Sequence, residues 1–383
     1  MHISSAFHLD QPQPKSGPGS YEWWYFDAAD AQNKWHLVVI YYDGCPFSTA
    51  YNRAVEEHPE RARPAGHPAI TVSLYYEGKP VFYSTSEYPP AQAAFYPEIR
   101  PLNEHLSEIS LKIGKNSLSL RYDNTHKKLE HHLFIDETLP SGDKLSGRLV
   151  FRADAPEGSL FGQETAAGNT LKPSQDGHGW NLTQPRASVD ARLELHSAVS
   201  GWQQIEWTGI GYHDHNLGSE PMRNEFTDWY WGRFHFPEHT LIYYLMRTEA
   251  GLSYKAWLLD GQLKLQHTLT SGHLEGFMSN AFMLPAARII ELKEENGGKE
   301  GVKVMIQQSQ AIDSGPFYYR FLSEAILDAG AQQRIEQAKG ITEYIRPARI
   351  HYRLFWPLVH MRYRYVAAPH WVQRSPRLYR WTW

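Results

Sequence analysis

The run Tyr-His-Asp-His-Asn at residues 212–216 is the densest group of hydrogen-bonding side chains in the sequence, and glycines flank it. If the run lies in a strand, its side chains alternate between two faces. His213 and His215 then share one face, and the other face carries Tyr212, Asp214 and Asn216. An aspartate between two histidines can hold or relay a proton, and burial among tryptophans would favour its protonated form. The run therefore predicts an acid–base site centred on Asp214.

Two other interpretations of this run stay open. Two histidines spaced His-x-His on a strand bring their imidazoles together and could bind zinc, with a third ligand such as His235 or His239. The HExxH motif is absent and Cys45 is the single cysteine, so we assign no metal to the predicted site. In the purely structural interpretation, Asp214 and Asn216 satisfy backbone donors in tight turns beside glycine.

A second candidate acid is Glu22, which begins the aromatic run EWWYF. In a strand, Glu22 shares a face with Trp24 and Phe26. If that face points into a barrel, the carboxyl lies in apolar surroundings and tends to stay protonated. The GxSxG elbow, the phosphate-binding loop and the complete GxGxxG fingerprint are all absent. The sequence therefore gives no support to serine hydrolysis or to a nucleotide cofactor.

The composition narrows the class of protein. The chain has 383 residues, with 38 Lys+Arg, 42 Asp+Glu and a formal net charge of −4. This near-neutral balance argues against nucleic-acid binding, and one cysteine excludes an intramolecular disulfide bond. No run approaches the roughly 18 apolar residues of a membrane-spanning helix, and the N-terminus lacks the features of a signal peptide. We therefore expect a soluble protein of the cytoplasm.

The elements that must position these residues are predicted to be strands. Short aromatic and β-branched runs recur along the chain, and turn signals separate them. This pattern is typical of an all-β sandwich or barrel. The main helix candidate is the stretch at residues 331–339 (AQQRIEQAK), which ends before Gly340.

An internal similarity suggests how the strands are grouped. Glu22–Phe26 is followed by an apolar run ending Tyr41-Tyr42, and Asp228–Trp231 is followed by one ending Tyr243-Tyr244. Such a repeat fits two similar β-domains, which we place at residues 1–185 and 186–383 with a glycine-rich linker at about 154–184. Chance similarity between aromatic strands is the alternative explanation.

The C-terminal part differs in composition. No acidic residue follows Glu343, and arginines alternate with aromatic residues up to Trp383. This segment could lie on an anionic membrane surface or bind single-stranded nucleic acid by stacking. In the structural alternative, its arginines pair with acidic residues of the body. We expect no nucleic acid and keep peripheral membrane contact as a hypothesis.

Several motifs together resemble a known family. They are EWWYFD at residues 22–27, GxGYxDHNxG at 209–218, WxWGR at 229–233, FYxR at 317–320 and the arginine- and aromatic-rich stretch at 343–364. They are similar to motifs of the carotenoid 1,2-hydratases (hydroxyneurosporene synthases) and the AttH-like proteins, and more distantly of lipocalin-like pericyclases and hydratases. The resemblance implies an all-β chain of two tandem lipocalin-like β-barrel domains packed together, with few short helices.

The resemblance also implies a reaction. A hydro-lyase of this kind adds water to the terminal C1=C2 bond of an acyclic carotenoid without a cofactor, so its partners are a hydrophobic polyene and water. An acid protonates the alkene, aromatic faces stabilise the tertiary carbocation, and water attacks it. The alternatives are another isoprenoid or polyketide hydratase, cyclase or pericyclase, and a non-catalytic carrier of lipophiles.

The site residues that we carry over from the motifs fall into two groups. The expected catalytic residues are Asp214, His215, Tyr243, Tyr244 and Glu22. The expected substrate-binding residues are Trp24, Tyr212, His213, Asn216, Trp229, Trp231 and Arg233.

Two positions depart from the hydratase pattern. Leu217 stands where the hydratases have a tryptophan, and the strand at residues 243–246 lacks their aspartate after a tyrosine. Asp214 or Glu22 therefore has to supply the proton.

Overall fold

The computed structural model describes residues 2–15, 17–123, 125–154, 178–295, 301–330 and 335–383. The chain is mostly β, with 59% strand and 14% helix, which confirms the predicted class. It folds into two compact units. The first unit comprises Met1–Pro221 and Arg353–Trp383, and the second comprises Met222–Tyr352.

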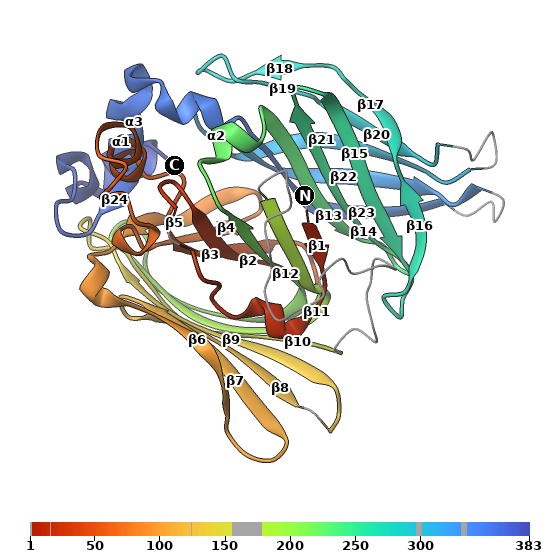
Figure 1. Ribbon diagram of the computed structural model, residues 1–383, viewed down its shortest axis with the longest axis horizontal. Coiled ribbons are helices and arrows are strands. Elements are labelled where there is room, and N and C mark those ends of the chain that lie inside the picture. The colour runs from red at the N-terminus through yellow and green to blue at the C-terminus, as the bar shows by residue number, and fades with distance from the viewer. Residues whose placement is uncertain (1, 16, 124, 155–177, 296–300, 331–334) are drawn as a thin grey trace. The chain divides into compact units, whose positions relative to one another are not determined.

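The first unit contains one large, mostly antiparallel sheet (Figure 1). In spatial order its strands are β24 (Tyr363–Tyr365), β5 (Lys79–Glu87), β4 (Ala69–Tyr76), β3 (Trp35–Asp43), β2 (Tyr21–Asp30), β12 (Gly201–Gly218), β11 (His178–Ser197), β10 (Lys144–Asp154), β9 (Lys128–Thr138), β8 (Asn116–Asp123), β7 (Leu106–Ile113) and β6 (Ala93–Pro101). A short strand, β1 (His2–Ser4), pairs in parallel with β11.

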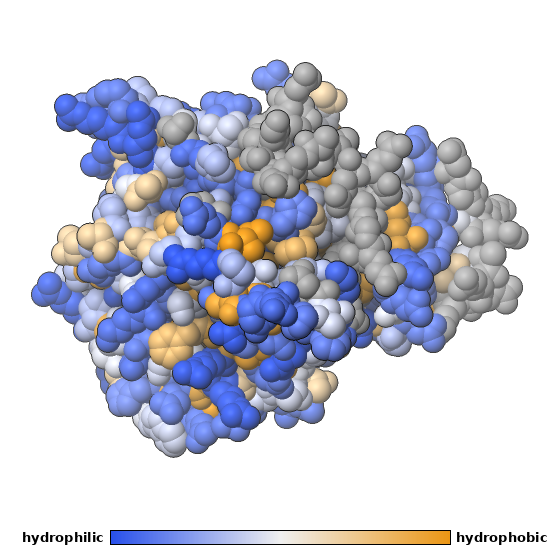
Figure 2. Space-filling view, turned by 60° about the horizontal axis from the view of Figure 1, so that its bottom comes forward, coloured by the Kyte–Doolittle hydropathy of each residue, from blue (hydrophilic) through white to orange (hydrophobic). Residues whose placement is uncertain are grey.

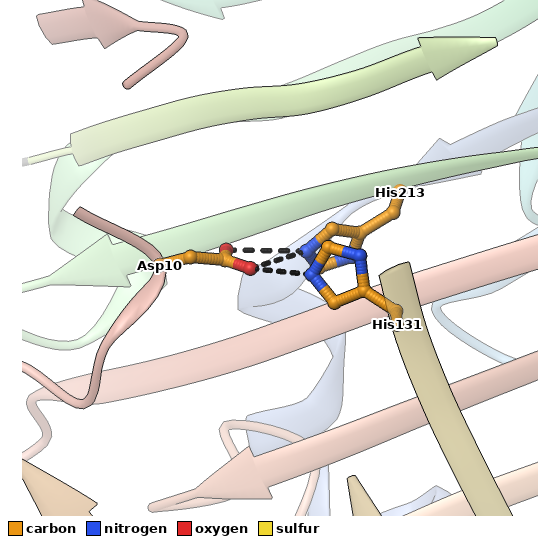
Figure 3. Close-up of side chains that lie close together, drawn as sticks. All are labelled: Asp10, His131 and His213. Atoms are coloured by element: carbon orange, nitrogen blue, oxygen red, sulfur yellow. Dashed lines mark hydrogen bonds and ion pairs between the residues drawn. The ribbon is translucent and has the colours of Figure 1, made fainter. Parts of the chain in front are cut away.

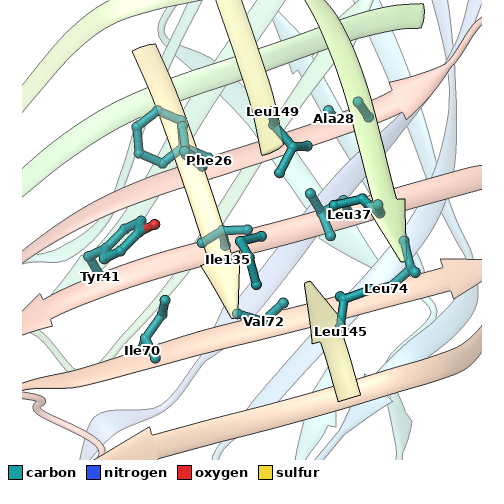
Figure 4. Packing of buried hydrophobic residues seen from close by; sticks show 14 of the residues in the cluster. Phe26, Ala28, Leu37, Tyr41, Ile70, Val72, Leu74, Ile135, Leu145 and Leu149 are labelled. Carbon is teal, nitrogen blue, oxygen red and sulfur yellow. The ribbon is translucent and has the colours of Figure 1, made fainter. Parts of the chain in front are cut away.

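Side chains from distant strands of this sheet meet in one core, so the sheet curves around its interior like a barrel. Figure 4 shows Phe26 and Leu37 from β2 and β3 beside Ile135 and Leu149 from β9 and β10. The face shown in Figure 2 is mainly hydrophilic where it is coloured, with hydrophobic side chains in small patches. Burial of this apolar surface is the main force that holds the barrel together.

The second unit is built on a sheet of its own. In spatial order its strands are β16 (Leu265–Leu269), β15 (Gly251–Leu259), β14 (Thr240–Thr248), β13 (Asp228–His235), β23 (Ile335–Ile345), β22 (Tyr318–Asp328), β21 (Lys303–Ser314), β20 (Ile289–Lys293) and β17 (Ser271–Glu275). Strands β18 (Met278–Ser279) and β19 (Pro285–Ala286) form a small separate ladder. The two aromatic runs that resemble each other form one antiparallel hairpin in each unit, β2–β3 and β13–β14.

Helices are few and short, as expected. The α-helices are α1 (Thr49–Glu57), α2 (Met222–Glu225), α3 (Trp356–Arg362) and α4 (Pro376–Trp381). The 3-10 helices are η1 (Phe7–Asp10), η2 (Pro64–Gly66), η3 (Pro90–Gln92), η5 (Pro347–His351), η6 (Arg353–Phe355) and η7 (Trp371–Arg374). Among the described residues, no helix is long and apolar enough to cross a membrane.

The units divide the chain differently from the predicted domains. The expected boundary between residues 185 and 186 falls inside β11, whose ladder with β12 continues on both sides of it. Residues 178–184 of the expected linker belong to this strand, and residues 155–177 lie outside the described part of the chain. The C-terminal segment returns to the first unit, where β24 pairs with β5.

The predicted helix at residues 331–339 is wrong where it can be checked. Residues 335–339 begin strand β23, and residues 331–334 lie outside the described part of the chain. Pairing with β22 along the whole strand outweighs the helix propensity of glutamine, glutamate and alanine.

Candidate functional site

Strand β12 carries the polar run and lies between β2 and β11. Within it, His213 pairs with Phe26 of β2 and His215 pairs with Trp24, so these side chains share the face that points into the core of the first unit. Asp214 pairs with Tyr25 on the opposite face. All five residues of the run are buried, and the strand divides them between two faces, as its alternation predicts.

On the inner face, Asp10 joins two histidines (Figure 3). Its Oδ2 lies 2.8 Å from His131 Nε2 and 2.9 Å from His213 Nε2. None of the three is more than 2% exposed. Burial alone would raise the pKa of Asp10, but the charge of His213 and hydrogen bonds from both rings hold it well below its usual value. Burial, reinforced by the charge of His213, lowers the pKa of His131 to about 4.

A second inner-face cluster surrounds Glu22. Its Oε1 lies 2.8 Å from His215 Nε2, and its other oxygen forms an ion pair with Lys15, which also pairs with Asp43. Burial would raise the pKa of Glu22, but the charge of Lys15 and the hydrogen bond from His215 lower it instead. These surroundings favour an ionised Glu22 over the protonated acid that the sequence led us to expect.

Both clusters fasten the N-terminal segment to the barrel. His215 Nδ1 donates to the backbone carbonyl of Leu9 (3.0 Å), and Trp24 Nε1 donates to that of Asp10 (2.8 Å). Trp24 also stacks on His215, with ring centroids 4.6 Å apart. Trp24 and His215, which we expected in substrate binding and catalysis respectively, therefore hold residues 9–10 in place.

Asp214, on the opposite face of β12, is bound by neutral donors. Its Oδ2 accepts hydrogen bonds from Trp180 Nε1 (2.8 Å) and Tyr212 Oη (2.6 Å), and its Oδ1 accepts one from Asn216 Nδ2 (2.8 Å). Asp214 itself is buried. Three neutral donors therefore surround the Asp214 carboxyl.

The orientation of Asn216 follows from its neighbours. His178 Nε2 donates to Asn216 Oδ1 (3.1 Å), and His178 Nδ1 accepts from Tyr21 Oη (3.0 Å). Tyr21 also stacks on Trp23. This chain of hydrogen bonds directs the Asn216 amide nitrogen at Asp214 and surrounds the carboxyl with aromatic rings.

The remaining expected site residues belong to the second unit. Trp229, Trp231 and Arg233 lie on β13, while Tyr243 and Tyr244 lie on β14. Tyr243 belongs to the core of that unit, where burial raises its pKa well above its usual value. Tyr244 points to the other face and stacks with Trp229. The two tyrosines therefore lie on opposite faces of β14.

The sequence did not reveal the charged pair Arg320–Glu343, which lies beside Trp231 across neighbouring strands. Arg320 Nε donates to Glu343 Oε1 at 2.8 Å, and both side chains are buried. Glu343 pairs with Trp231 on one side and with Arg320 on the other. The sequence showed Arg320 only as part of a family motif, and nothing in the local pattern linked it to Glu343.

The chain is similar over most of its length to one protein family and to individual proteins of known name. A family model described as carotenoid hydratase CrtC matches residues 105–368. Hydroxyneurosporene dehydrogenase of Chlorobaculum tepidum is 30% identical over 88% of this chain and 85% of its own length. Acyclic carotenoid 1,2-hydratase of Thiocapsa roseopersicina is 25% identical over 86% of this chain and 71% of its own length.

Solved structures share the fold at low sequence identity. CghA with Sch210972 has a TM-score of 0.58 and 11% identity, covering 90% of this chain and 97% of its own. Kievitone hydratase from Nectria haematococca has a TM-score of 0.52 and 12% identity, covering 90% and 96%. The fold and the extent of the family match agree, and the chain belongs to the carotenoid hydratase CrtC family.

Proposed function

We propose that the protein adds water to the terminal C1=C2 bond of an acyclic carotenoid without a cofactor, and that Asp214 transfers the proton. Three of the relatives are named acyclic carotenoid 1,2-hydratases, which supports the substrate class. The observation that carries the role of Asp214 is its setting: a buried carboxyl, bonded to Trp180, Tyr212 and Asn216, among aromatic rings.

The proposed reaction has two steps. The acid form of Asp214 delivers its proton to C2, and the electron pair of the double bond forms the new C–H bond, leaving a tertiary cation at C1. Donors from Trp180, Tyr212 and Asn216 stabilise the carboxylate as it forms, and aromatic faces stabilise the cation. A water oxygen then bonds to C1 and loses one proton, which restores the acid form of Asp214.

The proposal predicts a water-adduct of acyclic carotenes only. Purified protein incubated with lycopene in detergent should give products heavier by one or two waters, with a hydroxyl at C1 and, in heavy water, one deuterium at C2. β-Carotene, whose ends are cyclised, should stay unchanged. Mass spectrometry of the extracted pigments measures the added water and deuterium in the lycopene products and checks that β-carotene is unchanged. Tight pigment binding with no product would instead indicate a carrier, and a cyclised product would indicate a cyclase.

We further propose that part of the C-terminal segment contacts the membrane that holds such a hydrocarbon. Two of its arginines are structural, since Arg364 pairs with Glu137 and Arg380 with Asp143. In contrast, Trp371 on η7 is 65% exposed and Trp381 on α4 is 78% exposed. Exposed indoles beside arginines suit the headgroup level of an anionic bilayer.

The double variant Trp371→Ser/Trp381→Ser should therefore bind anionic vesicles at least about tenfold more weakly, because each indole contributes about 1 kcal/mol on insertion. Co-sedimentation at low salt measures this binding. Trp202→Ser is the matched control, since Trp202 of β12 is 61% exposed but lies outside the C-terminal segment. Wild-type sedimentation of the double variant, or an equal loss in the control, would contradict the proposal. Point substitutions are preferable to truncation, which would remove the core residue Tyr379.

A further inference from the structure

Three side chains on the inner face bring metal-ligating atoms together. Asp10, His131 and His213 each offer one such atom, and these atoms all lie within 4.8 Å of one another. They come from η1, β9 and β12, and Figure 3 shows both rings directing Nε2 at the carboxylate. Two imidazoles and a carboxylate form a donor set that zinc accepts.

The outer nitrogens of the two rings are placed as they are in metal-binding histidines. His213 Nδ1 donates to the backbone carbonyl of Tyr25 at 2.9 Å. Beside the other ring, His131 Nδ1 and Gln184 Oε1 are buried and make no hydrogen bond with the described residues, although the Gln184 side chain interacts with His131. A hydrogen on His131 Nδ1 directed at Gln184 would satisfy both atoms. Each ring would then have an outer N–H bonded to a carbonyl oxygen and a bare Nε2 facing Asp10.

Without a metal ion, hydrogens on the ring nitrogens bond to the Asp10 carboxylate. A divalent ion at this site would displace them. Protons on both rings would create two imidazoliums with ring centroids only 4.2 Å apart in a buried site. Such like charges are costly out of water. A single divalent ion would instead contact both nitrogens and one Asp10 oxygen at once, since these atoms lie within 4.8 Å of one another.

We propose that Asp10, His131 and His213 bind one zinc ion, which fastens the N-terminal segment to strands β9 and β12. The ion lies on the face of β12 opposite Asp214, so its role is structural and is independent of the proposed hydration. The sequence pattern alone suggests His213 and His215, with His235 or His239, as zinc ligands. In the structure, Asp10 and His131 lie beside His213 instead, and His215 bonds to Glu22.

The test is the metal content of the full-length, untagged protein. After incubation with zinc and gel filtration, mass spectrometry should find about one zinc per chain in the wild type. His131→Gln should retain less than about a tenth of that, because the amide still reaches Asp10 but is a poor zinc ligand. His132→Gln is the control, since this neighbouring half-buried histidine bonds to Glu130 and should leave the zinc content unchanged.

Two further measurements do not depend on how well the variant folds. Metal-free wild type titrated with Co²⁺ should develop visible absorption that saturates at about one equivalent, and chelation of the zinc protein should lower its melting temperature. A wild type that takes up neither zinc nor cobalt would overturn the proposal. Zinc retention by His131→Gln equal to that of the wild type would also overturn it.

Discussion

Replacing Asp214 by asparagine should reduce kcat for hydration by about a thousandfold or more, while the affinity for the polyene changes little. Asparagine has nearly the same shape but carries no acidic proton. Its NH2 group also faces a hydrogen-bond donor in either orientation: Trp180 and Tyr212 at the Oδ2 position, or Asn216 at the Oδ1 position. The substitution therefore removes both the proton donor and the stabilised conjugate base, and leaves the apolar contacts that hold a hydrocarbon.

Turnover of lycopene and quenching of tryptophan fluorescence by the pigment separate these two effects. Glu22→Gln provides the comparison, because Glu22 lies on the inner face and is paired with Lys15 and His215. We expect that variant to be less stable, with its folded fraction hydrating at the wild-type rate. If Asp214→Asn hydrates normally and Glu22→Gln does not, the proton comes from the inner face and our assignment is wrong.

The features that sequence predicted well were local. Strand alternation separated His213 and His215 from Asp214, and the structure shows that division across β12. The aromatic runs likewise became hairpins. Each of these predictions needs only the period of a strand and turn signals close in sequence.

The partners of those residues were not predictable from local pattern. Asp10 and His131 lie 121 positions apart in the chain and meet only through the curvature of the sheet. His131 alternates inward on β9, while its neighbour His132 is half-buried. The residues next to a buried histidine in the sequence do not indicate that it pairs with a distant aspartate.

Trp180 and His178 were missed for a different reason. They lie in a stretch that looked like a linker because it lacks alternation, yet it is the start of β11. Both faces of this stretch are buried, so polar and apolar residues need not alternate there. The register with β12 also shifts between Asn181 and Gln184 and again before Ala187, which breaks the strand period.

The largest expected loss of stability follows from removing Arg364, which lies in β24 near the C-terminus. Its guanidinium donates to Glu137 (Nη2 to Oε2, 2.6 Å) and also to Ser86 and to the backbone of Thr138. Glu137 is completely buried. Arg364→Met keeps the apolar stem but leaves Glu137 as a buried charge without its cation, so we expect unfolding free energy to fall by about 3–5 kcal/mol.

Arg353→Met is the matched control for this prediction. Arg353 is also an arginine of the C-terminal segment paired with a glutamate, Glu57, but its side chain is 62% exposed. Exposed pairs contribute about 1 kcal/mol or less because water and salt screen them. Urea unfolding of both variants should separate the buried pair from the surface pair.

The double variant Arg364→Met/Glu137→Gln identifies the source of the loss. The amide that replaces the buried carboxylate carries no charge, and its oxygen can still accept from Asn116 and Tyr88, which now donate to Glu137. If the cost of Arg364→Met comes from an unpaired buried charge, the double variant should recover part of the stability that the single variant loses. A single variant no less stable than Arg353→Met, or a double variant less stable than Arg364→Met, would show that an unpaired buried charge is not the source of the loss.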